Sequence, residues 1–246
     1  MSRPRVVALV QARMGSTRLP GKVLLDLGGE PVLARVMDRL GRARSLDAVV
    51  VATTLEPEAA RIVELCGERG WAVTRGSTED LLDRYHHAAR EHGAQVVVRV
   101  TSDCPLIDPE VVDRVVEAFL ADPSLDYCSN TIPPRTFPRG LDTEAFSFAA
   151  LERAWREDDR PDWREHVTPY LYRNPDRFRL RVVTDEVDRS DMRWTVDTPE
   201  DLAFARTVYA HFGNGDAFGW RDVLAALEAH PDWARINAHV EQKVVR

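Results

Sequence analysis

The chain has 246 residues, of which 44% are hydrophobic and 30% are charged, and its formal net charge is −7. This length and composition fit one globular domain of ordinary size. An acidic chain lacks the basic surface with which proteins attract nucleic acids and anionic membranes, so we expect neither as a partner.

The cysteines indicate a reducing compartment, and the apolar runs give no sign of a membrane span. Cys66, Cys104 and Cys128 are odd in number and show no C-x-x-C spacing, which predicts free thiols and gives no sign of a zinc site. The apolar runs are about five residues long, far short of a membrane span, and the N-terminus lacks the apolar stretch of a signal peptide. We therefore expect a cytoplasmic protein.

The first half of the chain alternates between short apolar runs and helical patterns. Residues 6–10, 48–52 and 96–100 are β-branched runs without polar alternation, which is typical of parallel strands covered on both faces. Helical periodicity is found at residues 31–43, 58–69, 78–92 and 108–121. Strands that alternate with helices predict βαβ units. We therefore expect an α/β fold with a doubly wound, mostly parallel, Rossmann-like sheet.

The second half of the chain is less regular. From about Asp126 to about Val187 the sequence is rich in proline and turn formers. We expect a single domain over residues 1–246, in which residues 126–187 form an inserted arm before the chain returns to the sheet. The elements predicted here are helices at 148–156 and 163–172, strands at 178–183 and 192–196, and helices after 198, around 220–229 and near 231–240.

The arm contains several apolar side chains that a small insertion does not easily bury against itself. They are Phe137, Phe146, Phe148, Phe178 and Leu180. Burial against a second copy of the chain would cover them, which predicts a homodimer formed through the arm. The alternative is a monomer whose arm folds back on its own sheet.

A basic, glycine-containing loop follows the first apolar run. Lys22 ends the sequence QARMGSTRLPGK, and it is one of only two lysines among the 33 basic residues. A lysine ammonium is a compact point charge and an arginine guanidinium is a planar fork, so a lysine kept in an arginine-rich chain indicates a separate role. The loop offers glycines for close backbone approach, a hydroxyl and several cations, from Gly15, Gly21, Ser16, Arg13, Arg18 and Lys22. These groups suit a polyphosphate, and the alternative is a solvated basic loop.

The loop is not a Walker A motif. Five residues separate Gly15 from Gly21 where that motif has four, and Val23 stands in place of the hydroxyl that binds magnesium. Any phosphate site here must therefore be of another type.

Two aspartates follow predicted strands that are far apart in the sequence. Asp103 comes after the run at 96–100, and Asp197 comes after the strand predicted at 192–196. Ligands of an open α/β sheet lie at the carboxyl ends of its strands, where two carboxylates suit a Mg²⁺ completed by phosphate oxygens and water. The alternatives are a loop aspartate that binds its own backbone amides at 103 and, at 197, a helix start capped by Thr198.

Residues 12–22 resemble the signature A-R-x-x-S-x-R-L-P-G-K of the CMP-sugar cytidylyltransferase family, and Gln11 with Met14-Gly15 is similar to the branch of spore-coat polysaccharide biosynthesis protein F. The fixed positions are filled by Ala12, Arg13, Ser16, Arg18, Leu19, Pro20, Gly21 and Lys22. The resemblance implies a nucleotide-diphospho-sugar transferase-like fold, CTP as the nucleotide, and Mg²⁺ on Asp103 and Asp197. It also implies that Arg13, Arg18 and Lys22 neutralise the leaving pyrophosphate, beside Ala12, Gly15 and Ser16. Cys104 and the pair Thr101-Ser102 depart from the octulosonate enzymes, which usually have Glu and Gln-Gly there.

Two further regions gain candidate residues from the same resemblance. Residues 75–85 resemble the nucleobase loop, in which Arg75, Gly76 and Ser77 would offer backbone groups to cytosine and Arg84 would reach a phosphate; the alternative is a capped helix with exposed charges. Residues 138–146 and 163–170 resemble the acceptor segments, whose candidate substrate-binding residues are Arg139, Asp142, Glu144, Arg164, Glu165 and His166. His166 would orient or deprotonate the attacking oxygen, or else be a neutral structural histidine bonded to Glu144 or Asp142.

We therefore expect a CTP-dependent cytidylyltransferase, in which an acceptor oxygen attacks the α-phosphorus of CTP and pyrophosphate leaves. The expected acceptor is anionic: an acidic sugar, or a phosphorylated or phosphonate metabolite. One alternative is a glycosyltransferase of the same fold that uses a nucleotide-sugar donor, which Ser102-Asp103-Cys104 disfavours because it is not a D-x-D motif. The other is a non-catalytic nucleotide-binding subunit.

Overall fold

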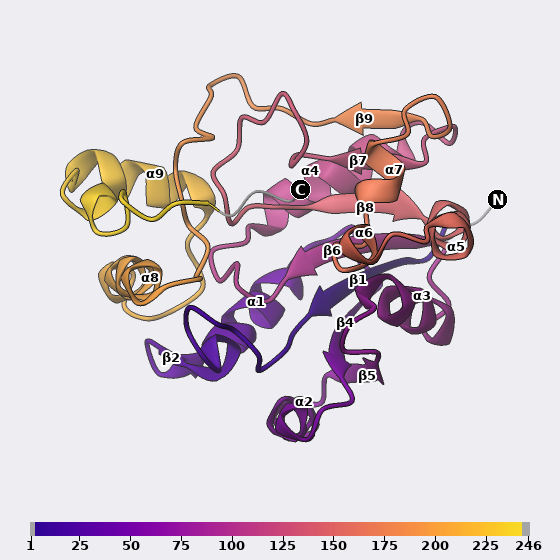
Figure 1. The fold of residues 1–246 in the computed structure, drawn as a ribbon. Helices are drawn as coiled ribbons and strands as arrows, with labels where there is room; N and C mark the ends of the chain where they lie inside the picture. The colour runs from indigo at the N-terminus through magenta and orange to yellow at the C-terminus, as the bar shows by residue number, and fades with distance from the viewer. Residues whose placement is uncertain (1–2, 243–246) are drawn as a thin grey trace.

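A computed structural model describes residues 3–242, and its centre is a seven-stranded sheet (Figure 1). In spatial order the strands are β5 (Ala72–Gly76), β4 (Ala48–Thr54), β1 (Val6–Gln11), β6 (Val96–Thr101), β8 (Glu144–Ser147), β7 (Tyr127–Ser129) and β9 (Leu180–Val182). The first four are parallel, β8 runs antiparallel to both of its neighbours, and β9 is parallel to β7. A separate two-stranded sheet pairs β2 (Asp26–Leu27) with β3 (Glu30–Pro31).

Helices cover both faces of the sheet and create two apolar cores. The first core contains side chains of α1 (Val32–Leu40), α2 (Ala60–Arg69), α4 (Pro109–Leu120), α8 (Pro199–His211) and α9 (Trp220–Ala229). The second contains side chains of α3 (Leu81–Glu91), α5 (Phe148–Glu157) and α7 (Pro169–Tyr172), and Trp163 of α6 (Pro161–Arg164) packs against it. In β1, Val6, Ala8 and Val10 enter the first core and Val7 and Leu9 the second. Because both faces of this strand are buried, its sequence shows no polar alternation.

The predicted α/β class and the mostly parallel sheet are confirmed, but several elements of the second half differ from expectation. Residues 192–196 form no strand; their ladder contact is a single bridge between Arg139 and Arg193. The helix predicted at 163–172 is divided into α6 and α7, because Val167 between them has φ +67°. Near 231–240 the described residues contain only the 3₁₀ helix η3 (Trp233–Arg235), and the other 3₁₀ helices are η1 (Lys22–Leu24) and η2 (Pro57–Ala59).

The segment expected to form an arm supplies β7, β8 and β9 to the central sheet. Phe137, Phe146 and Phe178 are at most 3% exposed, and Phe148 and Leu180 pack against the second core. The expectation that these side chains need a partner surface is therefore wrong for Phe137, Phe146 and Phe178, which the chain buries itself, whereas Phe148 and Leu180 are partly exposed. Within the described residues, no helix combines the length and apolar character needed to cross a membrane.

Candidate active site

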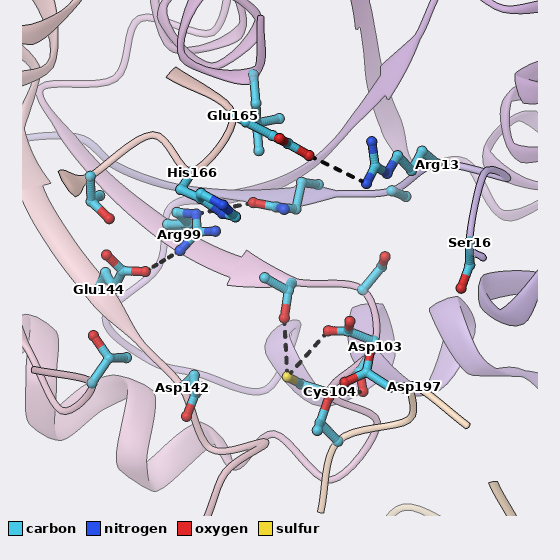
Figure 2. Close-up of a pocket in the computed structure, with 18 of the residues that line it drawn as sticks. Arg13, Ser16, Arg99, Asp103, Cys104, Asp142, Glu144, Glu165, His166 and Asp197 are labelled. Carbon is cyan, nitrogen blue, oxygen red and sulfur yellow. Dashed lines mark hydrogen bonds and ion pairs between the residues drawn. The ribbon is translucent and has the colours of Figure 1, made fainter. Parts of the chain in front are cut away.

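A cavity of about 810 Å³ opens at the carboxyl ends of β1 and β6. It brings together fourteen of the residues predicted from the sequence, and Figure 2 shows many of them. They are Ala12, Arg13, Gly15, Ser16, Arg18, Lys22, Arg84, Asp103, Arg139, Asp142, Glu144, Glu165, His166 and Asp197. Segments that are more than one hundred residues apart in the sequence thus share one cavity.

The basic loop, residues 12–22, forms one wall of this cavity. Its start continues β1, where Ala12 N donates to the carbonyl of Ala52 at 3.1 Å. Its end is closed by Gly21, which has φ +66° and donates its N–H to the carbonyl of Met14 at 3.2 Å. This left-handed conformation is accessible to glycine without steric cost, and it places Lys22 at the start of η1.

Lys22 lies between the two aspartates that were predicted to bind a metal. Its Nζ is 2.6 Å from Asp103 Oδ2 and 2.7 Å from Asp197 Oδ1. Burial lowers the pKa of Lys22, but Asp103 and Asp197 outweigh burial and the net pKa is raised. Burial raises the pKa of Asp197, whereas Lys22, Arg193 and Arg18 lower it, to about 2. Two carboxylate oxygens thus converge on one cation, as they would on Mg²⁺.

The backbone explains why Asp103 and Asp197 meet although residues 192–196 are not a strand. The carbonyl of Asp103 accepts hydrogen bonds from Val196 N at 2.7 Å and from Thr195 Oγ1 at 3.1 Å. Within residues 3–242, no group of three or more Asp, Glu, His or Cys side chains is arranged to hold a metal. Asp103 and Asp197 therefore suit an ion whose remaining ligands are phosphate oxygens and water.

A buried network that the sequence reading missed fixes Asp197. Arg193 contacts Asp197 Oδ2 at 2.7 Å and both oxygens of the fully buried Asp201 at 2.9 Å. Thr198 and Asp201 form the capping box of α8, so the cap does not need Asp197, whose side chain faces Lys22. The helix start that was the alternative role for this segment is therefore formed by Thr198 and Asp201. In the sequence, the spacing of Arg193, Asp197 and Asp201 at i, i+4 and i+8 was the signal from which this network could have been predicted.

The predicted nucleobase segment enters the cavity only in part. Arg75, Gly76 and Ser77 do not line it, because the Arg75 guanidinium donates to the carbonyl of Thr54 and Ser77 Oγ accepts from Asp80 N. Thr78 and Leu81 line it instead.

Arg84 does reach the cavity. It is 3% exposed, and its Nε has no hydrogen-bond partner among the described residues. Burial lowers its pKa to about 10. A buried guanidinium with a spare donor suits an anionic or carbonyl group of a ligand.

Arg164, which the sequence predicts to bind the acceptor, is engaged in contacts outside the cavity lining. Its guanidinium pairs with Asp80 at 2.7 Å and donates to the carbonyls of Trp155 at 3.0 Å and Asp158 at 2.8 Å. It does not line the cavity. The side chain at the end of α6 thus joins α6 to α3 and α5.

Arg99 is a cavity residue that the sequence analysis overlooked. It faces Glu144 across the β6–β8 pair, forms an ion pair with it, and donates to Gln11 Oε1 at 3.0 Å. Tyr127 OH donates to the second oxygen of Glu144 at 2.8 Å. The signal was a single charged residue inside the apolar run VVVRVT.

His166 lies beside Arg99 at the end of a tight turn (Figure 2). Thr168 N donates to the carbonyl of His166 at 2.8 Å, and Val167 between them has φ +67°, a left-handed value that is rare for a β-branched residue. His166 and Thr168 thereby line the cavity while Val167 enters the second core. Burial, followed by Arg99, lowers the pKa of His166. Its ring makes no hydrogen bond to Glu144, Asp142 or any other described residue.

The fold and the cavity together define a class of protein. An open α/β sheet that carries a cationic loop after its first strand and a pair of aspartates beside it is suited to bind a polyphosphate with a metal. Arg99, Arg139 and His166 line the same cavity and offer polar contacts to a second substrate. These are the features of a nucleotidyltransferase.

Comparison with known proteins identifies the family. A family model for cytidylyltransferases matches residues 7–218. The spore coat polysaccharide biosynthesis protein SpsF of Bacillus subtilis is 31% identical over 237 residues, which cover 93% of this chain and 96% of that protein. The chain belongs to the cytidylyltransferase family, as the resemblance of residues 12–22 predicted.

Solved structures agree with this assignment. A cytidylyltransferase from Leptospira borgpetersenii has a TM-score of 0.90 and 34% identity, with 99% of this chain and 100% of that chain covered. A CMP:2-keto-3-deoxy-manno-octonic acid synthetase complexed with CTP has a TM-score of 0.66 and 21% identity, with 85% and 99% covered. The second likeness shows the shared fold.

Proposed function

We propose that this protein transfers CMP from CTP to an anionic acceptor and releases pyrophosphate. Membership of the family makes the chain a CTP-dependent nucleotidyltransferase; the proposal adds the acceptor class and the roles of residues. The observation that carries it is that Asp103, Lys22 and Asp197, which contact one another, line the same cavity as the rest of the basic loop and Arg139. The structural relative complexed with CTP supports the choice of nucleotide.

On this proposal the residues of the first half hold the nucleotide. Arg13, Arg18 and Lys22 neutralise the charge that develops on the leaving pyrophosphate, and Arg84 binds the nucleotide through its spare donor. Asp103 and Asp197 hold Mg²⁺, which when bound supplies Lewis-acid polarisation of the α-phosphate. Catalysis is then mainly positioning and charge stabilisation, with little proton transfer.

The residues of the second half hold the acceptor. No acidic side chain of the described residues lies within ion-pair distance of Arg139, which leaves its guanidinium for an acceptor anion. Asp142 and Glu144 can accept hydrogen bonds from acceptor hydroxyls, and the lowered pKa of His166 keeps it neutral near pH 7, where it can accept a proton from the attacking oxygen. An acidic sugar fits these groups, and so does a phosphorylated or phosphonate metabolite.

A screen of the four nucleoside triphosphates against an acceptor panel tests the proposal. Pyrophosphate release with Mg²⁺, CTP and an anionic acceptor is expected. Release with neutral acceptors alone would overturn the acceptor class, and transfer of a sugar from a nucleotide-sugar donor would favour the glycosyltransferase. Nucleotide binding without any transfer would favour the non-catalytic subunit.

The homodimer and the cytoplasmic location remain predictions. Because Phe137, Phe146 and Phe178 are buried within the chain, these side chains no longer argue for the dimer. Light scattering at micromolar concentration tests it, and a mass that matches one chain would overturn it.

A further inference from the structure

We propose that Lys22 is the resident counter-ion of Asp103 and Asp197, so that the free enzyme binds a divalent cation weakly and binds it well only together with the nucleotide. The inference rests on the proposed function, in which these two carboxylates hold the metal. It assigns Lys22 a second task besides contact with the leaving group: it couples the binding of the two ligands.

Lys22 already contacts the two carboxylates that a metal would need as ligands. Its Nζ touches one oxygen of each aspartate, at 2.6 and 2.7 Å, and its side chain is only 12% exposed. An ammonium so placed and a divalent cation compete for the same two oxygens. At partly buried positions this competition is weakly screened by salt.

The neighbouring charges leave no surplus negative charge for a second cation. Arg18 lies 3.0 Å from Asp197 Oδ2, and Arg193 lies 2.7 Å from the same oxygen and also donates to both oxygens of Asp201. Asp201 neutralises the charge of Arg193. The two positive charges of Lys22 and Arg18 then balance the two negative charges of Asp103 and Asp197. A divalent cation entering the free site would meet a group that is already neutral.

A bound triphosphate changes this balance. Its charges lie on the basic loop, whose cations are Arg13, Arg18 and Lys22, and they offer the Lys22 ammonium another partner. A flexible four-carbon stem lets the ammonium leave the aspartates, whereas an arginine fork would hold both carboxylates through several directed bonds. This accounts for a lysine at this position in a chain that otherwise uses arginine for 31 of its 33 basic residues.

The consequence is a measurable coupling between two ligands. If nucleotide binding frees the aspartates, nucleotide raises metal affinity, and by thermodynamic linkage the metal raises nucleotide affinity by the same factor. Removing the Lys22 charge should raise metal affinity in the free enzyme and shrink this factor. The variant is thus expected to bind metal better than the wild type, although it transfers CMP poorly.

The experiment measures Mn²⁺ binding by electron paramagnetic resonance and calorimetry, in the absence and presence of α,β-methylene-CTP, which cannot transfer CMP. Free Lys22→Met should bind Mn²⁺ at least about tenfold more tightly than the wild type. Arg13→Met is the matched control, because Arg13 carries the same charge in the same cavity but contacts Glu165 at 3.8 Å and neither aspartate. It should change Mn²⁺ affinity less than about threefold. Lys22→Arg should keep the weak binding of the free enzyme.

Two results would count against the inference, and they are distinguishable. Equal Mn²⁺ affinity of Lys22→Met and wild type, while binding with the analogue is still lost in Asp103→Asn, would overturn the inference and leave the metal site standing. Mn²⁺ binding that is unaffected by Asp103→Asn in every state would overturn both. Because Lys22→Met removes the ion-pair partner of Asp103 and one of the partners of Asp197, the thermal midpoint of the variant is measured as well. Mn²⁺ should raise this midpoint more than it raises that of the wild type.

Discussion

The two halves of the molecule build the same cavity by different means. In residues 6–121, the parallel strands β1, β4, β5 and β6 alternate with helices, and most of the cavity residues lie at the ends of β1 and β6, with others at the start of α3. In residues 126–197, short strands are joined by long irregular connections, and Arg139 and residues 195–196 are held by hydrogen bonds to distant backbone. The first half therefore carries its site in local patterns, and the second half carries it in tertiary contacts.

This difference separates two tasks. The first half presents the basic loop directly after β1, at the carboxyl edge of the parallel part of the sheet. The second half presents Arg139 and His166 from irregular connections and Glu144 from β8, and irregular segments commonly carry the residues that recognise a substrate. If nucleotide chemistry depends on the first half and acceptor recognition on the second, substitutions in the two halves should have different effects.

The largest effect is expected at the aspartates, where the two halves meet. Asp103→Asn and Asp197→Asn should each lower turnover by roughly 10²-fold to 10³-fold, because one charged ligand at the α-phosphate is lost. Steady-state pyrophosphate release gives the turnover, and circular dichroism checks the fold. Chelator should abolish activity and Mg²⁺ should restore it. An Asp197→Asn variant that loses thermal stability but keeps turnover would remove Asp197 from the metal site.

A backbone contact in the second half gives the next largest effect. Gly140 has φ +107°, and a Cβ added there would lie 2.7 Å from the carbonyl carbon of Trp194. Gly140→Ala should therefore lower the free energy of unfolding by about 2 to 4 kcal/mol, measured by urea denaturation. Gly29→Ala is the control, since Gly29 has φ +90° but nothing within 4 Å of the added Cβ. Equal losses in the two variants would show that the close approach to Trp194 is unimportant.

These contacts explain which parts of the molecule the sequence could predict. The strands 6–10, 48–52 and 96–100 and the loop ending at Lys22 were found because hydrophobic period and motif spacing are local. The strand predicted at 192–196 was wrong, because Trp194 N donates to the carbonyl of Arg139 and Val196 N to the carbonyl of Asp103, and neither acceptor belongs to a strand. Arg99 was overlooked and the contacts of Arg164 were not predicted because the partners of both, Glu144 and Asp80, are 45 and 84 residues away.

Two arginines of the second half are expected to have different roles, one in acceptor binding and one in stabilising the fold. Arg139→Ala should raise the acceptor KM about 10-fold to 100-fold and leave the KM for CTP nearly unchanged, since one charge-assisted contact with the acceptor is lost. Arg164→Ala should instead lower the thermal midpoint, because Asp80 and two carbonyls lose their partner. Initial-rate kinetics with each substrate varied separate the two cases. A rise in acceptor KM for Arg164→Ala at full folding would return Arg164 to the acceptor side.

The smallest effect is expected where α3 of the first half packs against α5 of the second. His86 is 2% exposed and stacks on Trp155 with ring centroids 4.1 Å apart, and neither ring nitrogen has a hydrogen-bond partner among the described residues. Burial lowers the pKa of His86, followed by His87, while Glu152 and Asp83 act in the opposite direction. A folded-state pKa below the unfolded value of about 6.5 means that the unfolded chain takes up the proton first as pH falls. The stability associated with a neutral His86 is therefore present above about pH 6.5 and is lost below it.

His86→Phe keeps the aromatic stack and removes the titration, so it should be neutral or stabilising by up to about 1 kcal/mol at pH 7, with a larger advantage at pH 5. Urea denaturation at the two pH values measures the difference, and His87→Phe, on an exposed position of the same helix, serves as the control. If wild type and His86→Phe lose stability equally between pH 7 and pH 5, the contact between the two halves does not depend on the protonation of His86.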